Sequence, residues 1–494
     1  MIVNDTMNTL PIELYRAEQV RELDSIAIEQ CGIPGFQLMS RAGLAAFQKL
    51  QQHWPEADSL AVFCGAGNNA GDGYIVARLA LESGMLVTVY AVLPAEKLHG
   101  DARLAMHNYQ QIGGEIIPYE RGMACKAELI VDALLGTGLD RPVTGIYAQA
   151  IETINGLDRP VVALDIPSGL HADTGSVLGC AVHASCTISF IGLKRGQFTG
   201  EAADYCGKIH FSSLDVPQDI YSGMPVAAWR LTEPHLPRRR RCEHKGSNGH
   251  VLIIGGEQGY SGAARMAAEA AARVGAGLVS IATRAAHAAL MNGCRPELMC
   301  HGVENARQLR PLLDRATVIV VGPGLGRSQW ASDLLHAAME SGKPLLVDAD
   351  ALNLLANTTF SNAHWVLTPH PGEAARLLDC SVRDVQKDRF AAAEALQQRY
   401  SGCVVLKGAG TLIVDASATY VCGTGNPGMA SGGMGDVLSG VIGGLMAQRL
   451  AVIEAVKSGV HVHGAAADSA AEQGERGMLA GDLLPHLRRL VNVR

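Results

Sequence analysis

Short apolar runs alternate with glycine-rich segments and helical patterns along almost the whole chain, and this alternation limits the possible folds more than any other feature. The apolar run 60–64 leads into GAGNNAGDG and a helical pattern, and the run 161–164 leads into DIPSG. Repeated strand–loop–helix units form parallel sheets with helices on both faces, and ligands bind at the carboxyl ends of the strands. The sequence therefore predicts an α/β protein, with strands at residues 60–64, 86–93, 128–133, 161–164, 187–192, 208–212, 250–256, 317–321, 344–347, 365–367, 403–406 and 420–422, and a further strand in GLVSIA after an Ala-rich helix.

The length of the chain indicates more than one domain. Its 494 residues are too many for one ordinary hydrophobic core. The periodic pattern is lost between Ser213 and Arg241, where prolines recur. We predict a first domain at residues 1–215, a linker at 216–246 and a second domain at 247–494. The basic run at the end of the linker, Arg238 to Arg241, is interpreted as a solvated junction, with steering of phosphorylated ligands as an alternative.

Charge and cysteine usage exclude several classes of protein. The formal net charge is −7, so the chain has no basic footprint for nucleic acid or an anionic membrane. Its twelve cysteines form no CxxC pair, which favours reduced thiols over zinc ligands. The N-terminus has no signal-peptide pattern, and no apolar stretch is long enough to span a membrane. We expect a cytoplasmic protein without nucleic-acid or membrane partners, and a homo-oligomer because symmetric assembly is common.

The densest cluster of glycines surrounds one acidic residue, Asp436, in GNPGMASGGMGDVLSG at residues 425–440. Glycine-rich backbone can approach an anion closely, and a helix that begins near Asp436 would point free N–H groups at the same place. A carboxylate facing phosphate needs a task of its own, and the usual one is to accept a proton from a hydroxyl that is being phosphorylated. The alternative is a glycine-rich turn in which the acid only caps a helix.

Polar residues also follow three predicted strands of the first half. Asn68, Asn69 and Asp72 lie in GNNAGDG, Asp132 ends the strand 128–133, and Asp165 begins DIPSG. Because the carboxyl ends of parallel strands meet at one edge, these groups are expected to share a site. Each acid could instead be a helix cap or a turn residue.

The same GAGNNAGDG segment satisfies a loose dinucleotide-binding fingerprint through Gly65, Gly67 and Ala70. That fingerprint needs an acid at the end of the next strand to hold a ribose, and the strand 86–93 ends in Pro94 instead. An ordinary NAD-dependent dehydrogenase is therefore disfavoured.

In the second half, Lys407 follows a strand and precedes glycines, so it could meet a phosphate, although solvated lysines are commoner there. His370 and Glu373 in TPHPGEA could equally mark a helix start. His461 and His463 are interpreted as core or surface residues of a helix. No set of residues has the spacing of a transition-metal site, and Mg²⁺ carried by a nucleotide is the metal we expect.

Several motifs in order give the chain a specific resemblance. Through GPGLG, VDADALN, TPHPGE, KGAG and GNPGMASGGMGD, the second half resembles the ribokinase-like ADP/ATP-dependent NAD(P)H-hydrate dehydratases. Through GNNAGDG, DALLGTGL and DIPSG, the first half resembles the Rossmann-like NAD(P)H-hydrate epimerases. Together they are similar to the bifunctional NAD(P)H-hydrate repair enzymes. The resemblance implies that the first half interconverts R and S NADHX and NADPHX. The second half would then return the S form to NAD(P)H with ADP as phosphate donor, leaving AMP and phosphate.

The resemblance also implies residue roles. Asp436 and Asp165 would be catalytic, Asp165 by assisting loss and return of the C6 hydroxyl, and K⁺ would be held by Asn69, Asp132 and Ser168. Ala70 departs from a pattern that often has glycine, and its methyl could crowd the loop. Substrate would contact Asn68, Asn69, Ala70, Gly71, Asp72, Gly136, Thr137, Gly138, Leu139, Asp140, Arg141, Pro142, Asp165, Ala263, Gly324, His370 and Asp436. ADP, with Mg²⁺, would contact Lys407, Gly408, Ala409, Gly410, Thr411, Asn426, Gly428, Ser431, Gly432, Gly433, Met434 and Gly435.

One alternative keeps the fold and changes the function. The second half could be a vitamin or sugar kinase, and the first half a noncatalytic binding domain. A kinase would leave a stable phosphorylated product, and a binding domain would not exchange the R and S epimers. Residues alone do not distinguish ADP from ATP, or NADHX from NADPHX.

Overall fold

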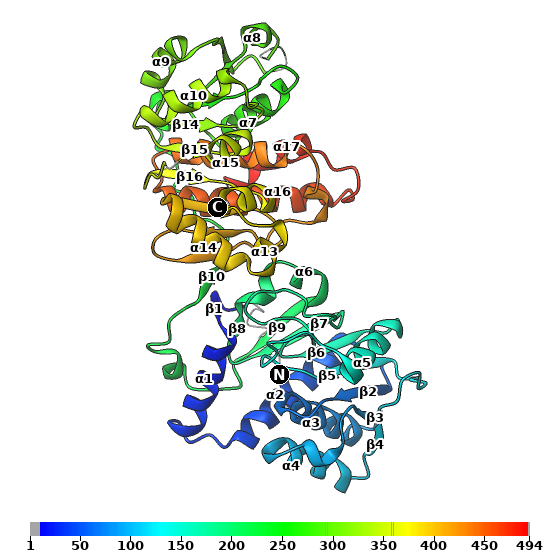
Figure 1. Ribbon diagram of the computed structural model, residues 1–494. Helices are drawn as coiled ribbons and strands as arrows, with labels where there is room; N and C mark the ends of the chain where they lie inside the picture. The colour runs from blue at the N-terminus through cyan, green and yellow to red at the C-terminus, as the bar shows by residue number, and fades with distance from the viewer. Residues whose placement is uncertain (1–9, 292, 294, 357, 359, 493–494) are drawn as a thin grey trace. The chain divides into compact units, whose positions relative to one another are not determined.

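The computed structural model describes residues 10–291, 293, 295–356, 358 and 360–492 (Figure 1). Contacts along the chain divide it into two compact units, Met1–Trp229 and Arg230–Arg494. The predicted linker 216–246 contains a short strand, β10 (Ala228–Arg230), so that part of it is ordered. The boundaries at residues 215 and 247 stay a prediction. No helix in the described part of the chain is both long and apolar enough to cross a membrane.

The first unit contains a parallel sheet in the order β4-β3-β2-β5-β6-β7-β9 (Figure 1). Side chains of β2 alternate between two cores, since Leu60, Val62 and Cys64 lie in one and Ala61 and Phe63 in the other. Helices α1 to α4 contribute to the first core and α5 to the second, so both faces of the sheet are covered. The strands are β2 (Ser59–Cys64), β3 (Leu86–Ala91), β4 (Glu115–Pro118), β5 (Leu129–Ala133), β6 (Val161–Leu164), β7 (Cys186–Phe190) and β9 (Lys208–Ser212), and the helices are α1 (Ala17–Glu29), α2 (Gly35–His53), α3 (Asn68–Glu82), α4 (Gly100–Gln111), α5 (Gly145–Gly156) and α6 (Ala202–Tyr205).

A short strip of strands completes this unit. Strand β1 (Glu13–Tyr15) pairs in parallel with β8 (Leu193–Lys194), and it pairs antiparallel with β10. Strand β8 has both of its residues buried. The strip therefore carries one lysine, Lys194, into the interior.

The second unit is organised around the strand order β13-β12-β11-β14-β15-β16-β17-β18-β19. All pairs from β13 to β17 are parallel, whereas β18 and β19 are antiparallel. The strands are β11 (His250–Ile254), β12 (Leu278–Thr283), β13 (Met299–Gly302), β14 (Val318–Val321), β15 (Leu345–Val347), β16 (Trp365–Leu367), β17 (Cys403–Leu406), β18 (Leu412–Val414) and β19 (Thr419–Val421). The helices are α7 (Ser261–Arg273), α8 (Ala285–Met291), α9 (Ala306–Arg315), α10 (Gln329–Glu340), α11 (Ala349–Leu355), α12 (Pro371–Leu378), α13 (Val382–Lys387), α14 (Arg389–Tyr400), α15 (Met434–Ala447), α16 (Val452–Ala471) and α17 (Ala480–Leu490).

Glycines allow the central helix α15 to pack unusually closely. A Cβ atom added at Gly440 would lie 2.0 Å from the carbonyl oxygen of Ala267 in α7, and one at Gly443 would lie 2.4 Å from Val320 in β14. Side chains at these positions would push α15 away from both elements. The glycines after Asp436 thus bring α15 down onto the sheet and α7.

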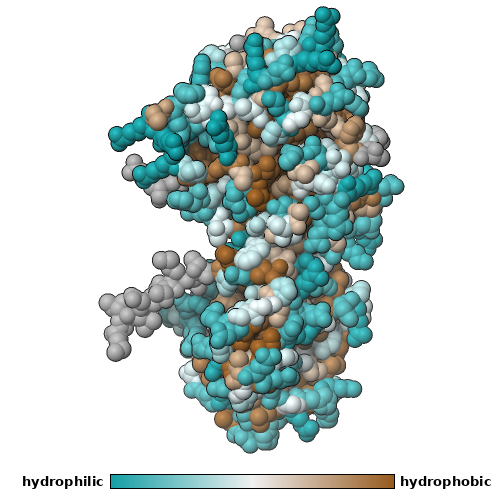
Figure 2. Space-filling view, turned by 90° about the vertical axis from the view of Figure 1, so that its left-hand side faces the viewer, coloured by the Kyte–Doolittle hydropathy of each residue, from teal (hydrophilic) through white to brown (hydrophobic). Residues whose placement is uncertain are grey.

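The predicted fold class, two α/β units with parallel sheets, is confirmed. Strands β1, β4, β8, β10, β13 and β18 were not among the predictions, because they are short or only half buried. Figure 2 shows that hydrophilic residues cover most of the visible face, with smaller hydrophobic areas between them. The apolar faces of the elements are used mainly in the cores.

Candidate active sites

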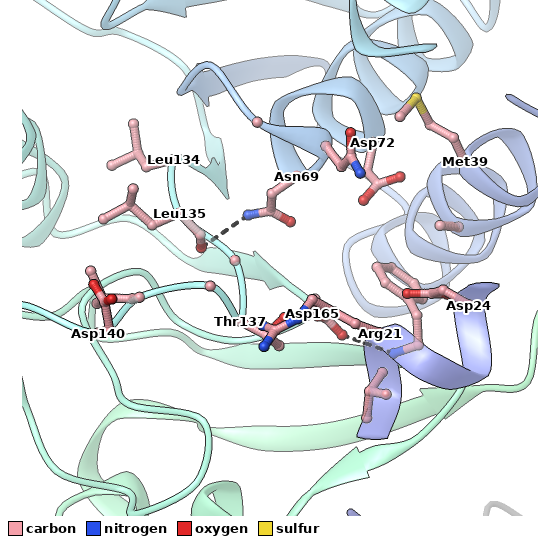
Figure 3. A pocket seen from close by; sticks show the side chains of 18 of the residues that line it. Arg21, Asp24, Met39, Asn69, Asp72, Leu134, Leu135, Thr137, Asp140 and Asp165 are labelled. Atoms are coloured by element: carbon pink, nitrogen blue, oxygen red, sulfur yellow. Dashed lines mark hydrogen bonds between the residues drawn. The ribbon is translucent and has the colours of Figure 1, made fainter. Parts of the chain in front are cut away.

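The first unit has a cavity of about 890 Å³ at the carboxyl ends of β2 and β5 (Figure 3). The chain leaves β2 toward β3 on one side and returns to β5 on the other, so this is the point where strand order reverses and ligands bind in open parallel sheets. We call this cavity the first site. Of the predicted substrate residues, the first site is lined by Asn68, Asn69, Asp72, Gly136, Thr137, Gly138, Leu139, Asp140, Arg141, Pro142 and Asp165.

The GNNAGDG segment is helical and not an open loop. Helix α3 begins at Asn68, so the segment forms its first turn and brings free backbone N–H groups to the cavity. The side chain of Ala70 is fully buried, and a Cβ atom at Gly71 would lie 2.5 Å from Met39. These two predicted substrate residues therefore face the core. The methyl group of Ala70 is accommodated there and does not crowd the cavity.

Asn69, Asp132 and Ser168 converge beside the first site. The fully buried Asp132 accepts hydrogen bonds from the Ser168 hydroxyl (2.6 Å) and backbone N–H (2.8 Å). Ser168 and Asn69 both contact Leu135, because the Leu135 N–H donates to the Ser168 hydroxyl oxygen (2.8 Å) and the Asn69 amide donates to the Leu135 carbonyl (3.2 Å). Burial raises the pKa of Asp132 to about 6, against the effect of the Ser168 bonds.

One polar atom in this cluster lacks a partner. The Asn69 Oδ1 is buried, and within the described residues nothing donates a hydrogen bond to it. A buried acceptor without a donor is costly, and a cation would satisfy it. The oxygens of Asn69, Asp132 and Ser168 are hard ligands suited to K⁺. The residues present therefore fit the predicted ion.

Asp165 forms an ion pair with Lys194, which the sequence analysis did not single out. The Asp165 Oδ1 contacts the Lys194 ammonium and also accepts the Phe190 N–H at 3.1 Å. Asp165 is left-handed, with φ of 65°, a conformation that costs energy in a residue other than glycine. Surrounding contacts hold this strained residue at the wall of the first site.

Among the other acidic residues that line the same cavity are Asp24 and Asp72 (Figure 3). Burial, followed by the charge of Asp165, raises the pKa of Asp24 to about 6. The same causes raise the pKa of Asp72 well above its usual value. The first site thus brings together carboxyl groups whose pKa is raised by burial, a feature that is common at functional sites.

The second site lies at the carboxyl ends of the parallel strands of the second unit. Asp348 follows β15, Glu373 lies in the first turn after β16, and Lys407 follows β17. The Lys407 ammonium contacts Asp348 Oδ1 at 2.8 Å and Glu373 Oε2 at 3.8 Å. The Ser439 hydroxyl of α15 donates to Asp348 Oδ2 at 2.7 Å. The ends of β15 and β17 and the helices α12 and α15 are therefore joined by one charge network.

Asp436 lies in the first turn of α15, as the glycine-rich pattern predicted. A Cβ atom at Gly435 would lie 3.2 Å from the Lys407 ammonium, so the lysine stands against the start of this helix. Burial, followed by the negative charge of Asp348, raises the pKa of Asp436 to about 7. Such a carboxyl group is suited to proton transfer at neutral pH.

Helix α16 holds the start of the predicted nucleotide loop in place. Asp468 of α16 accepts hydrogen bonds from Gly425 N–H and the Asn426 amide, both at 3.0 Å. Gly433, with φ of 90°, precedes the first turn of α15. The loop ends where the helix N–H groups are free, which favours an anion. The remaining predicted residues of this loop are Gly428, Ser431, Gly432, Met434 and Gly435, and Ser431 donates to Met478 O at 3.2 Å.

The second predicted nucleotide segment, KGAG and Thr411, rests on a buried arginine of α14. Arg389 is 1% exposed and donates hydrogen bonds to the carbonyl oxygens of Leu406 (3.2 Å) and Lys407 (3.3 Å). A Cβ atom at Gly408 would lie 2.9 Å from its guanidinium group. Thr411 closes the turn through bonds to Gly408, and Ala409 and Gly410 lie between them. Arg389 therefore fixes the path of this loop.

The predicted substrate residues of the second unit lie at neighbouring strand ends. A Cβ atom at Gly324 would lie 3.1 Å from Ala263, so these two residues are adjacent. His370 Nε2 lies 3.3 Å from Glu373 Oε1, and His370 Nδ1 accepts the Gly372 N–H at 2.9 Å. The helix-start interpretation of TPHPGEA is confirmed, because Glu373 closes a capping box at the start of α12, and Glu373 also lies 3.8 Å from the Lys407 ammonium.

Comparison with known proteins agrees with this arrangement. Residues 251–489 match the family described as NAD(P)H-hydrate dehydratase, and residues 35–196 match the family described as YjeF-related protein N-terminus. The bifunctional NAD(P)H-hydrate repair enzyme Nnr of Coxiella burnetii is 52% identical over 485 residues, which cover 97% of this chain and 99% of that protein. The chain belongs to the bifunctional NAD(P)H-hydrate repair enzyme family.

A second curated relative matches nearly the whole chain, and a solved structure matches about half of it. The bifunctional NAD(P)H-hydrate repair enzyme Nnr of Escherichia coli is 45% identical over 98% of this chain and 95% of its own. Among solved structures, the ADP/ATP-dependent NAD(P)H-hydrate dehydratase from Bacillus subtilis is 30% identical, with a TM-score of 0.48. The matched region covers 52% of this chain and 93% of the Bacillus subtilis chain.

Several polar residues of this repair-enzyme chain were missed by sequence reasoning. Asp348 lies in the quoted motif VDADALN, so its position after a predicted strand was a usable signal. Lys194, Arg389 and Asp24 had no such signal, because each belongs to an ordinary strand or helix pattern. Lys407, for which the solvated alternative was commoner, is instead largely buried, with 18% of its side chain exposed.

Proposed function

We propose that this protein repairs hydrated NADH and NADPH by two reactions on one chain. The first site interconverts the R and S epimers of NADHX and NADPHX. The second site dehydrates the S epimer to NAD(P)H and consumes ADP, with AMP and phosphate as products. The observation that carries the proposal is the pairing of two different carboxylate sites with family membership over the whole chain.

The proposed dehydration begins with proton transfer to Asp436. The C6 hydroxyl oxygen of the substrate attacks the β-phosphorus of ADP while Asp436 accepts the hydroxyl proton, and AMP leaves. The ring-nitrogen lone pair then expels phosphate from C6, and loss of the C5 proton forms the C5–C6 double bond. The pKa of Asp436, about 7, supports its role as the base.

ADP binding is assigned to the glycine-rich loop, the KGAG segment and the N-terminus of α15. Backbone N–H groups of α15 and the ammonium of Lys407 would balance charge on the phosphoryl group in transfer. The carboxylates near Lys407 are oxygen ligands of the kind that Mg²⁺ takes together with phosphates. Magnesium would supply further positive charge to the nucleotide when bound. Mg²⁺ and ADP are parts of this proposal.

Epimerisation is assigned to Asp165 and the surrounding cavity. The C6 hydroxyl takes a proton from solvent or from a carboxylic acid of the cavity and leaves as water, and the ring nitrogen stabilises the cation at C6. Water can then return to either face and gives up one proton as the hydroxyl forms again. Asp165 assists this exchange because its carboxylate lies at the cavity wall. Asn69, Asp132 and Ser168 would hold K⁺, which contributes positive charge next to the substrate-binding turn of α3.

The cysteines and the net charge support the proposed compartment and the proposed absence of nucleic-acid partners. The described cysteines are all free thiols, which supports a reducing compartment such as the cytoplasm. The formal net charge of −7 argues against nucleic acid as a partner. Assembly into a homo-oligomer rests on the general frequency of symmetric complexes.

The direct test is to incubate the purified protein with mixed NADHX epimers and ADP, and separately with ATP. NADH absorbance should reappear, and both epimers should be consumed because the first site feeds the second. A kinase would instead accumulate a phosphorylated compound without NADH. If only half of the substrate is converted beyond the spontaneous rate, the epimerase assignment is wrong.

A further inference from the structure

Lys194 of the first unit is fully buried, at 0% exposure. Its ammonium group donates to Asp165 Oδ1, to the Ser189 hydroxyl at 3.0 Å and to the Phe190 carbonyl at 3.3 Å. A lysine ammonium has three protons, so these contacts use all of them. Burial of a charge is costly unless it is paired and hydrogen-bonded, and here both conditions are met.

Asp165 is held from several directions at once. Its N–H donates to Ile188 O at 2.8 Å, and its carbonyl accepts the Gln197 amide at 2.9 Å. Gln197 in turn accepts the backbone N–H of Lys194 at 3.0 Å. These bonds maintain the left-handed backbone of Asp165 and link it to the lysine through main chain as well as side chain.

The direction of the carboxylate follows from its contacts. Within the described part of the chain, the hydrogen bonds to the Asp165 carboxylate end on Oδ1, from Lys194 and from Phe190 N–H. The other oxygen, Oδ2, is therefore the one that remains for a ligand, and Asp165 lines the first site. Only 17% of the Asp165 side chain is exposed, so its approach to substrate is confined to this side.

The charge of Lys194 also organises the other acids of the first site. Asp24 and Asp72 face the cavity with Asp165 (Figure 3), and burial raises the pKa of both, followed by the negative charge of Asp165, whereas Lys194 lowers it. Without Lys194, the acids of the first site would lose the buried positive charge that lies beside them.

We propose that Lys194 is a positioning residue of the epimerase reaction, which acts by fixing the Asp165 carboxylate with one oxygen toward the substrate. This inference rests on the proposed function of the first site. Packing alone does not require a charge at this position, because an apolar side chain of similar volume would fill the same space in β8 at a lower cost in desolvation free energy. The inference therefore gives the buried ammonium a chemical role.

The test compares Lys194→Met with Lys208→Met, an exposed lysine of β9. Lys194→Met should lower kcat for epimerisation by about 10²-fold and change KM little, because small displacements of a catalytic group cost that much. The control variant should keep the full rate. Dehydration in both variants should equal that of the parent protein, since the second site belongs to the other unit.

Two measurements separate positioning from folding. In an Asp165→Asn background, Lys194→Met should have no further effect, because both changes act on one group. In Lys194→Ala, added methylamine should restore part of the epimerase rate, and it should not do so in Asp165→Asn. Additive losses in the double variant would overturn the proposal, and so would a full rate in folded Lys194→Met.

A variant that leaves the lysine in place covers the case in which Lys194→Met does not fold. Ser189→Ala removes one ammonium contact and should lower kcat several-fold; an unchanged kcat would contradict the positioning role. If the parent protein itself does not exchange the epimers, the proposed function fails, which is a different result from a failure of Lys194 alone.

Discussion

Replacement of Asp436 by asparagine tests the central chemical claim. Asparagine has nearly the same shape, so the glycine-rich loop and the start of α15 are expected to stay in place. The amide cannot accept the hydroxyl proton in the pH range of the assay. We expect the dehydratase rate to fall by about 10²- to 10⁴-fold, the usual contribution of a general base.

The structure also predicts the pH dependence of the parent protein. Burial and the charge of Asp348 raise the pKa of Asp436 to about 7, from a usual value of 3.8. The base must be ionised to accept a proton, so dehydration should rise with pH through about 7 and level off above it. An unperturbed aspartate would give a flat profile over the same range.

The assay follows NADH absorbance with S-NADHX and ADP at saturation between pH 5.5 and 9. Asp333→Asn, the same change at an exposed position of α10, is the matched control and should behave as the parent protein. Epimerisation by Asp436→Asn gives an internal control of folding. Retention of full dehydratase activity by folded Asp436→Asn would refute the proton-acceptor role.

Three further perturbations have defined outcomes. Exchange of K⁺ for Li⁺ should lower epimerisation roughly tenfold and leave dehydration unchanged, and Asp132→Asn should abolish this salt dependence. Arg389→Met should raise KM for ADP about tenfold, because the KGAG segment loses two hydrogen bonds from a charged donor, and an unchanged KM would contradict this. Burial lowers the pKa of His463 to about 4, so the unfolded state takes up its proton first as pH falls below 6.5. The free energy of unfolding, measured with denaturant, should therefore fall by up to about 3 kcal/mol between pH 6.5 and pH 4. In His463→Gln it should fall by less over the same pH range.

The sequence predicted the sheet architecture because buried parallel strands and their glycine-rich ends leave a strong pattern. Asp436 was singled out by the glycines around it, and residues of the first cavity by their position at or just after strand ends. The expected open loop at GNNAGDG was a helical turn instead. Its glycines are needed where α3 meets other elements, as Gly71 does at Met39.

Residues that act across the fold left no local signal. Lys194 and Asp165 are 29 positions apart, and Lys407 and Asp348 are 59 apart. Each pair is created by strand order, which hydrophobic periodicity does not encode. A buried lysine in a strand looks like an edge residue until its partner is in place.

The glycines along α15 have a consequence for anyone who alters this enzyme. Because Gly440 meets the backbone of Ala267 and Gly443 meets Val320, the helix cannot slide without a collision. Asp436 lies in the first turn of α15, so its position depends on the packing of Gly440 and Gly443 one to two turns further along the helix. Mutations intended to change the reaction should leave Gly440 and Gly443 in place, since even a single methyl group at either position would displace α15 and with it Asp436.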